Sequence, residues 1–278
     1  MTYWKFILQL PIAPNSTQLD FEPLLSAELL THYRHIANQP LTVVDVETTG
    51  SKSNRDRVIE ISLLQADLDT GIRHQQTHLI DSGVVVPPRI ADFTGIDTEM
   101  LQGSPAPTEI WPQYLPLLSK GILTAHNIRF DYAFITAELD RQAIAFVRPP
   151  QSQCCTVQLS RLLLSHLPSR RLPALVKHFK FPIDTSHRAE ADTLACWLLA
   201  ERLLSEIQSE SDEVLLEKFG LQTLSLSAAV AVLQCTTTRA LQAFEAANVR
   251  PLYTSKRGTP YYQRRFVEQV YWQLREVS

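Results

Sequence analysis

The sequence predicts an α/β fold in which a mixed sheet is flanked by helices, followed by a small, mostly helical C-terminal appendage. The first observation is a β-branched run at 41–47, which is typical of a buried strand. The second is that strand patterns come first and then alternate with helical patterns. The third is a basic C-terminal segment with helical periodicity. Hydrophobic residues make up 45% of the 278 residues, enough to bury a core.

A helix over 21–35 precedes the first strand, with leucines gathered on one face. A second strand at 58–66 and a third at 72–80 are joined by the turn sequence Asp67-Leu-Asp-Thr-Gly71, so we expect an antiparallel hairpin. The following segment, with Pro87, Pro88 and Gly95, is expected to be a loop. Further helices are expected at 108–118, 130–143, 172–179 and 188–207, and short strands at 122–125 and 153–156.

Charge divides the chain into unequal parts. The net charge is −3, but residues 221–278 contain seven Lys or Arg and three acids, hence 7 − 3 = +4, which leaves −3 − 4 = −7 for 1–220. We therefore expect four parts: an N-terminal extension at 1–40, an α/β domain at 41–205, an acidic linker at 206–220 and a basic C-terminal domain at 221–278. A basic end suits contact with nucleic acid.

Four cysteines form no C-x-x-C pair, so zinc and a disulfide framework are poorly supported. No segment reaches the ~20 apolar residues that would cross a bilayer. The N-terminal residues lack the small-residue cleavage site of a signal peptide. We expect no membrane partner and a cytoplasmic location.

Asp45 and Glu47 lie two residues apart on the first strand, so both side chains lie on one face. Two neighbouring carboxylates repel each other, and burial increases the penalty. A divalent cation would remove it. The alternative is that both acids lie in solvent at the end of the strand.

Two further acids open predicted helices. Asp131 follows His126 and Asn127, and Asp192 faces inward if the buried stripe of its helix contains Ala195. As an alternative, these acids and Asn127 are helix caps or partners of the helix dipole. His187, directly before the last of these helices, suits proton transfer near neutral pH.

Taken together, the three segments resemble the DEDDh 3′–5′ exonucleases, the group that includes the proofreading ε subunit of bacterial DNA polymerase III and ribonuclease T-like enzymes. Asp45-Val-Glu-Thr-Thr-Gly50, His126-Asn-Ile-Arg-Phe-Asp131 and His187-Arg-Ala-Glu-Ala-Asp192 match that group's three motifs in order. The similarity extends from about Leu41 to about Leu204. Lys180 stands where such proteins often have a glycine at a helix end, which concerns a cap and not the chemistry.

The resemblance implies a ribonuclease H-like fold and two divalent ions, Mg²⁺ or Mn²⁺, held by Asp45, Glu47, Asp131 and Asp192. It also implies that His187 is the general base and that the product is a nucleoside 5′-monophosphate. The substrate side of the site would comprise Thr48, Thr49, Gly50, His126, Asn127 and Phe130. Phe130 is equally compatible with a core position.

The resemblance leaves the substrate open. A DNA exonuclease of proofreading or repair, acting on single-stranded 3′ ends and associated with a DNA polymerase or another replication protein, is the first expectation. An RNA 3′ exonuclease of the ribonuclease T or oligoribonuclease kind has the same motifs. A DNA-binding regulator with a vestigial site is a third reading, against which the intact acids argue.

The basic C-terminal segment reads as helix, turn, helix, basic hairpin, helix. Its helices are expected at 226–233, at 239–247 and around 266–274, and its hairpin at 253–261. This order resembles a winged helix-turn-helix of the MerR or excisionase kind, with cations placed for phosphates. A helical appendage that docks on the catalytic domain or on another protein explains the pattern equally well.

Overall fold

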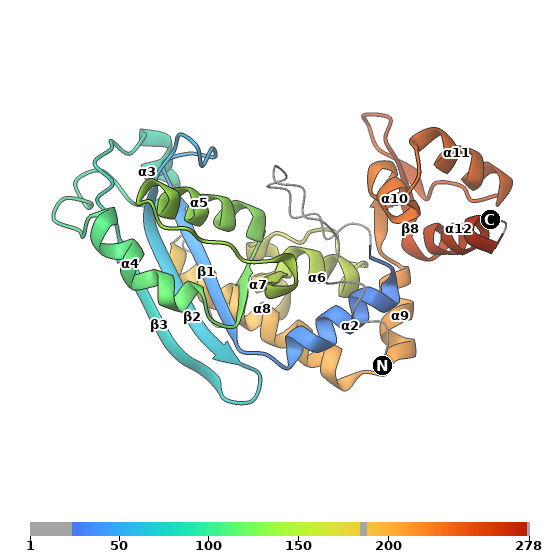
Figure 1. The fold of residues 1–278 in the computed structure, drawn as a ribbon, viewed down its shortest axis with the longest axis horizontal. Helices are drawn as coiled ribbons and strands as arrows, with labels where there is room; N and C mark the ends of the chain where they lie inside the picture. The colour runs from blue at the N-terminus through green and yellow to red at the C-terminus, as the bar shows by residue number, and fades with distance from the viewer. Residues whose placement is uncertain (1–23, 184–187, 277–278) are drawn as a thin grey trace.

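The structure, a computed structural model, describes residues 24–183 and 188–276. Its centre is a five-stranded mixed sheet with the strand order β3-β2-β1-β4-β5 (Figure 1). The strands are β1 (Leu41–Thr48), β2 (Val58–Asp67), β3 (Gly71–Leu79), β4 (Ile122–Ala125) and β5 (Gln153–Cys155). β1, β2 and β3 are antiparallel neighbours, and β4 and β5 continue the sheet in parallel. The predicted mixed α/β sheet is confirmed.

Alternation along β1 gives the sheet two buried faces. Val43 packs in one core with α2 (Ser26–Ala37), α6 (Thr156–Leu163), α7 (Leu172–Phe179) and α8 (Ala189–Ser209), whereas Val44 and Val46 pack in a second core with α4 (Pro107–Leu118) and α5 (Ile128–Arg141). Asp45 and Glu47 follow the alternation of Val43 and therefore lie on the α8 side of β1. The site is built where α8 and α5 meet this strand.

One predicted loop is a helix. α3 (Pro88–Thr94) begins with a proline at its first turn and ends at Gly95, whose φ of 71° is left-handed. Proline is compatible with the first helical position and glycine with the position after the last, so the residues read as loop signals are in fact the boundaries of a short helix. A short 3-10 helix, Pro150–Ser152, precedes β5.

Segments on both sides of the α/β domain share its core. Leu29, Leu30 and Ile36 of α2 are buried with Leu215 and Phe219 of α9 (Asp212–Gly220) in the cluster that also holds α8. The described part of the expected extension and of the expected linker therefore packs against the sheet's helices, while the division into four domains remains a prediction.

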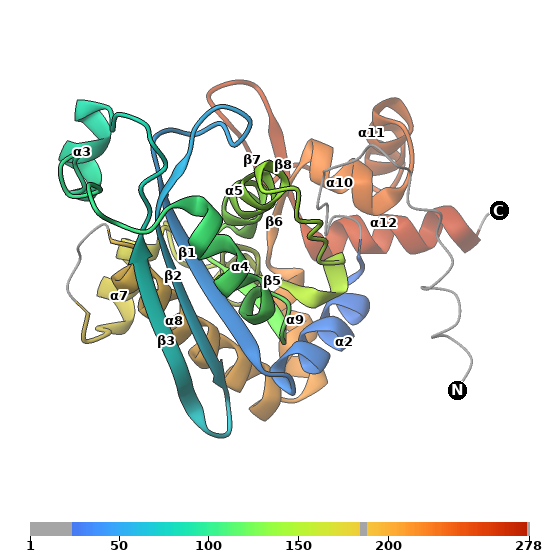
Figure 2. The same ribbon diagram turned by 60° about the vertical axis from the view of Figure 1, so that its left-hand side comes forward.

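The C-terminal residues have a core of their own, centred on buried side chains of β6, α10, α11, β8 and α12. The elements are β6 (Thr223–Ser225), α10 (Leu226–Leu233), α11 (Thr237–Ala246), β7 (Tyr253–Thr254), β8 (Pro260–Gln263) and α12 (Arg264–Glu276). They form a three-stranded sheet of order β6-β8-β7 beside the helices (Figure 2). The element order is the expected one, and its assignment as a winged helix-turn-helix remains a prediction.

Hydrogen bonds fix this C-terminal part to α2. Arg264, a residue that is 6% exposed, donates from its guanidinium to the Leu24 carbonyl at 2.8 Å and to Glu268 at 3.1 Å. Glu268 also accepts from the backbone N–H and the hydroxyl of Ser26, both at 2.8 Å. Among the described helices, none combines the length and the apolar character needed to cross a membrane.

Candidate metal centre

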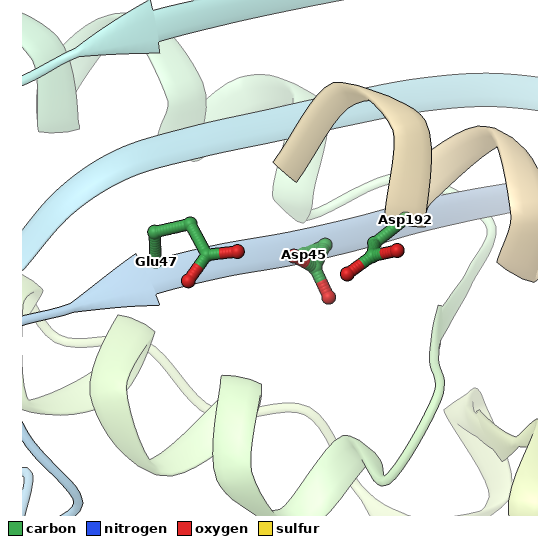
Figure 3. A group of neighbouring side chains, drawn as sticks. All are labelled: Asp45, Glu47 and Asp192. Atoms are coloured by element: carbon green, nitrogen blue, oxygen red, sulfur yellow. The ribbon is translucent and has the colours of Figure 1, made fainter. Parts of the chain in front are cut away.

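Three of the predicted acids meet in space. Asp45 and Glu47 project from β1, and Asp192 projects from the first turn of α8 (Figure 3). One carboxylate oxygen from each lies within 4.8 Å of the others. The two strand residues share a face because of alternation, and α8 crosses that face with Asp192 toward them. Oxygen donors so close together form a set that hard divalent cations prefer.

Asp131 lies in the first turn of α5 and is 2% exposed. Its Oδ1 accepts a hydrogen bond of 3.3 Å from the backbone N–H of Val46, the residue between Asp45 and Glu47. It is thus held against β1 and lines the same cavity as the other three acids. The structure brings together all four carboxylates that the motifs predicted.

The acids of the site are buried, and burial opposes their ionisation. Burial, followed by the charge of Asp192, raises the pKa of Glu47 to about 8. Burial also raises the pKa of Asp131 to about 8, against the opposing effect of its backbone hydrogen bonds. For Asp45, burial and then the charge of Asp131 raise the pKa well above its usual range. Carboxylates that resist ionisation together can all ionise when a cation lies between them, so these residues fit divalent metal.

An ion pair that the sequence did not predict supports Asp192. Glu60, on β2 and 1% exposed, accepts from Arg188 Nε at 3.1 Å and from its Nη2 at 2.5 Å. Glu60 also accepts from the backbone N–H of Ala189 at 3.0 Å, and so caps the start of α8. The available signal was that Glu60 breaks an apolar strand on the face that carries Glu47.

A second buried acid supports α5. Glu138 has no exposed surface and receives hydrogen bonds from Arg57 Nε at 2.8 Å and Nη2 at 3.0 Å. The backbone N–H of Val58 and the Arg141 side chain donate to it at 3.1 Å each. Because Glu138 lies two turns after Asp131 on the same helix, these bonds tie the helix of a metal-ligand candidate to β2.

The acids lie in an open cavity of about 460 Å³. Five of the six residues expected to contact substrate line it, namely Thr48, Gly50, His126, Asn127 and Phe130. Thr49 is not among the lining residues, and its hydroxyl accepts from the Arg57 backbone N–H at 2.9 Å. Arg89 and Phe93 also line the cavity, from α3. The sequence did not predict them as site residues because that helix was read as a loop. Phe93 is 58% exposed.

His126 has both ring nitrogens engaged. Nδ1 lies 2.9 Å from the Thr156 hydroxyl, and Nε2 lies 2.9 Å from the Arg170 carbonyl oxygen. Burial lowers its pKa to about 4, although the bond to Arg170 opposes the shift. At neutral pH the ring is therefore uncharged, donating from Nε2 and accepting at Nδ1. Such a ring orders the cavity wall and is a poor acceptor for a water proton.

Asn127 occupies the N-cap position of α5 in a left-handed conformation, with φ of 78°, and makes no side-chain capping bond. The alternative reading of Asn127 as an ordinary helix cap is therefore wrong. Its backbone conformation is one that asparagine adopts more readily than most residues. His187, the predicted base, lies outside the described residues.

Comparison with known proteins places this geometry in a family. The family model RNase_T, described as "Exonuclease", matches residues 42–199. The DNA polymerase III PolC-type of Clostridium perfringens is 29% identical over 170 residues, which are 61% of this chain and 12% of that protein. The 3′-5′ exonuclease DinG of Staphylococcus epidermidis is 30% identical over 155 residues, which are 54% of this chain and 16% of that protein. The chain thus corresponds to less than a fifth of either relative.

Among solved structures, E. coli exonuclease I in complex with a dT13 oligonucleotide has a TM-score of 0.56 at 15% identity. The similarity covers 82% of this chain and 64% of that one, and it identifies the ribonuclease H-like fold. The family match covers more than half of the chain and contains all four clustered acids. The chain therefore belongs to the exonuclease family.

Proposed function

We propose that the protein is a metal-dependent 3′–5′ exonuclease that releases nucleoside 5′-monophosphates from DNA. The observation that carries the proposal is the meeting of Asp45, Glu47 and Asp192 within 4.8 Å beside a cavity that is open to solvent. The matched family and the similarity to a relative named as a 3′-5′ exonuclease support the direction of attack. Similarity to a PolC-type polymerase favours DNA over RNA as substrate.

Two divalent ions, Mg²⁺ or Mn²⁺, would be held by Asp45, Glu47, Asp192 and Asp131. When bound, such ions supply an activated water and neutralise the charge that grows on the phosphate and the leaving oxygen. The protein's share is to hold four carboxylates in a fixed arrangement. It does so with β1 for two of them, the Glu60 anchor of α8 for Asp192, and the bond from the Val46 N–H for Asp131.

His187 would accept the proton of the attacking water, as its place in the third motif indicates. His126 is the other histidine of the motifs, and its two hydrogen bonds and lowered pKa make it unsuitable for that role. The aromatic rings of Phe93 and Phe130 line the cavity, where they suit stacking on unpaired bases of any sequence. Arg89 supplies positive charge for a phosphate at the same wall.

A single-stranded 3′ end fits this arrangement best, because an open cavity with aromatic walls contacts unpaired bases. The division into an exonuclease domain at 41–205 and a basic C-terminal domain at 221–278 is part of the proposal. Association with a DNA polymerase is the partner that the PolC-type relative suggests.

The test is a time course with a 5′-labelled single-stranded DNA oligomer and its RNA twin, with Mg²⁺ or Mn²⁺ and with EDTA. Asp45→Asn and Asp192→Asn are compared with Glu190→Gln, which removes an exposed carboxylate from the same turn of α8 as Asp192. We expect a ladder that descends from the 3′ end of DNA, loss of the ladder with EDTA and in both aspartate variants, and normal cleavage by Glu190→Gln.

The outcomes separate the alternatives. Faster cleavage of the RNA twin would replace DNA by RNA as the substrate. No cleavage of either strand by folded, metal-loaded protein would refute the proposal. Release of internal fragments would identify an endonuclease instead.

A further inference from the structure

The β7–β8 hairpin is strongly basic. No acid occurs between Glu245 and Glu268, while Arg250, Lys256 and Arg257 are all exposed in this segment. Like charges gathered on one hairpin repel each other unless an anionic partner is near. The charge therefore indicates a polyanion as the occupant of this surface.

The tip of the hairpin is a hydrogen-bonded turn. The Ser255 N–H donates to the Thr259 carbonyl at 2.8 Å, and the Gly258 N–H donates to the Ser255 carbonyl at 2.9 Å. Thr259 N–H also donates to the Ser255 hydroxyl at 3.1 Å, and Gly258 has a left-handed φ of 80°. These bonds close the turn, so Lys256 and Arg257 are presented from an ordered tip.

Exposed aromatic surface lies next to these cations. Tyr253 stacks on Tyr261 across the two strands with a centroid distance of 4.8 Å and an interplanar angle of 11°. Tyr253 remains 50% exposed, and Leu252 beside it is 55% exposed. Aromatic faces beside cations are the surface on which unpaired bases stack, largely independently of sequence.

Arg170 relates the hairpin to the cavity. Burial and then the charge of Arg161 lower the pKa of Arg170, and Tyr253, at the start of the hairpin, is near enough to raise it. The carbonyl oxygen of Arg170 bonds His126 at the cavity wall. In both ribbon views the hairpin rises toward the upper edge of the molecule, as α3 does, and Figure 1 shows the two toward opposite ends of the long axis (Figures 1 and 2).

We propose that the β7–β8 hairpin binds single-stranded nucleic acid upstream of the 3′ end that occupies the cavity, with Lys256 and Arg257 on phosphates and Tyr253 stacked on a base. This inference rests on the proposed exonuclease function. It favours a single strand over a duplex because α11, the helix that would enter a major groove, has only Arg239 as a cation and Glu245 as a matching acid. The hairpin then serves as a second contact that improves retention of the strand.

Substrate length tests the inference. Full-length Lys256→Gln/Arg257→Gln and Tyr253→Ala are compared with Lys120→Gln/Arg202→Gln, which removes two exposed cations from the α/β domain. Steady-state cleavage is measured on single-stranded DNA of about 4 and about 16 nucleotides. The shorter strand is chosen to occupy the cavity alone, and the longer one to extend well beyond it.

We expect each hairpin variant to raise KM about 10-fold on the long strand, leaving the short strand and kcat unchanged. The logarithm of the association constant decreases with the logarithm of the salt concentration, and this slope should be about 1.4 less steep in the double variant. Each phosphate contact of a single strand contributes about 0.7 to the slope. The control variant should behave like the wild type. Equal effects on both lengths, no effect on either, or the same loss in the control would overturn the inference.

A binding assay separates this inference from the proposed function. Fluorescence anisotropy of the long labelled strand is measured with Asp45→Asn protein in EDTA, alone and combined with the hairpin changes. Weaker binding caused by the hairpin changes supports the contact even if the wild type cleaves nothing. Unchanged binding of the single strand, or loss confined to a blunt duplex, would refute it.

Discussion

Arg188 and Glu60 form a bidentate ion pair beside the carboxylate cluster, with Nη2 and Oε1 2.5 Å apart. Glu60 lies directly opposite Glu47 in the antiparallel register of β1 and β2. One of these two neighbouring glutamates is thus neutralised by an arginine, and the other is left facing Asp45 and Asp192. The pair also binds the start of α8 to the sheet, three residues before Asp192.

Glu60→Gln should weaken metal binding without removing any ligand. The amide is a poorer partner for Arg188 and for the Ala189 N–H, so the start of α8 loosens and Asp192 is held less firmly. We expect the Mn²⁺ concentration for half-maximal activity to rise about 10–100-fold, the range for loss of a residue that orients a ligand. kcat should largely recover at saturating Mn²⁺. The control is Glu190→Gln, and an unchanged metal dependence would show that the anchor does not orient Asp192.

Asp45→Asn should inactivate the enzyme and stabilise the metal-free fold. It removes a ligand, so activity should fall more than about 10³-fold. It also removes a buried acid whose charge is opposed by Asp131, Asp192 and Glu47. Without metal we expect about 1 kcal/mol of added stability, or about 2–4 °C in Tm. Thermal unfolding in EDTA measures this, and a variant less stable than the wild type would contradict the account.

Stability of the metal-free protein should decline as pH rises. Glu47 and Asp131 have ordinary pKa values of 4.5 and 3.8 and folded values of about 8. The unfolded chain therefore releases protons that the folded chain keeps, so their stabilising effect is complete below about pH 4 and lost as pH rises through about 8. Denaturant unfolding between about pH 5 and about pH 8.5 in EDTA should show the decline, and Mn²⁺ should flatten it by favouring ionised ligands. A flat profile in EDTA would contradict it.

Part of the site could be predicted because it depends on local periodicity. Alternation alone placed Asp45 and Glu47 on one face, and helical spacing turned Asp192 inward. Glu60 could not be assigned in this way, because its partner Arg188 lies 128 residues further along the chain. The same holds for Glu138, which meets Arg57 only through tertiary packing.

The helices and strands likewise divide into those that local sequence patterns predict and those that they do not. The strand at 122–125 and the helices at 172–179 and 226–233 have the bounds that the sequence predicted, because apolar runs between clear breaks define them. α3 was missed because Pro88 and Gly95, only seven residues apart, were read as a loop and not as the two ends of a helix. Because this helix was not predicted, Arg89 and Phe93 were not expected in the cavity wall, which they line.

Gly50→Ala should lower activity by moving the loop at 51–56. A Cβ at this position would overlap the Asp56 carboxylate. That carboxylate accepts from the Lys52 backbone N–H at 2.8 Å, so it cannot move without releasing the loop. Because Gly50 lines the cavity, we expect kcat/KM to fall about 10-fold, chiefly through KM.

A double-mutant cycle isolates the clash. Asp56→Ala removes the carboxylate and should itself reduce activity through loss of the Lys52 bond. Adding Gly50→Ala to it should then have little further effect, because the overlapping atoms are gone. Additive losses in the double variant would mean that Gly50 matters for another reason, such as close approach of the substrate.

Glu138→Gln should separate stability from catalysis. Glu138 is fully buried, and its charge is compensated by Arg57 and Arg141. Replacing it with an amide leaves two arginines without their anion, which costs about 3 kcal/mol, or about 6–12 °C in Tm. Asp140→Asn, an exposed acid on the same helix, is the matched control and should leave Tm unchanged.

The activity of folded Glu138→Gln protein decides what this anchor does. If its only role is to tie α5 to β2, kcat measured well below Tm should change less than about threefold, since Asp131 keeps its own bond to Val46. A much larger loss of kcat with an intact fold, accompanied by a higher Mn²⁺ concentration for half-maximal activity, would instead mean that Asp131 relies on Glu138 for its position. In that case the two buried glutamates act alike, each holding the helix that delivers one aspartate to β1.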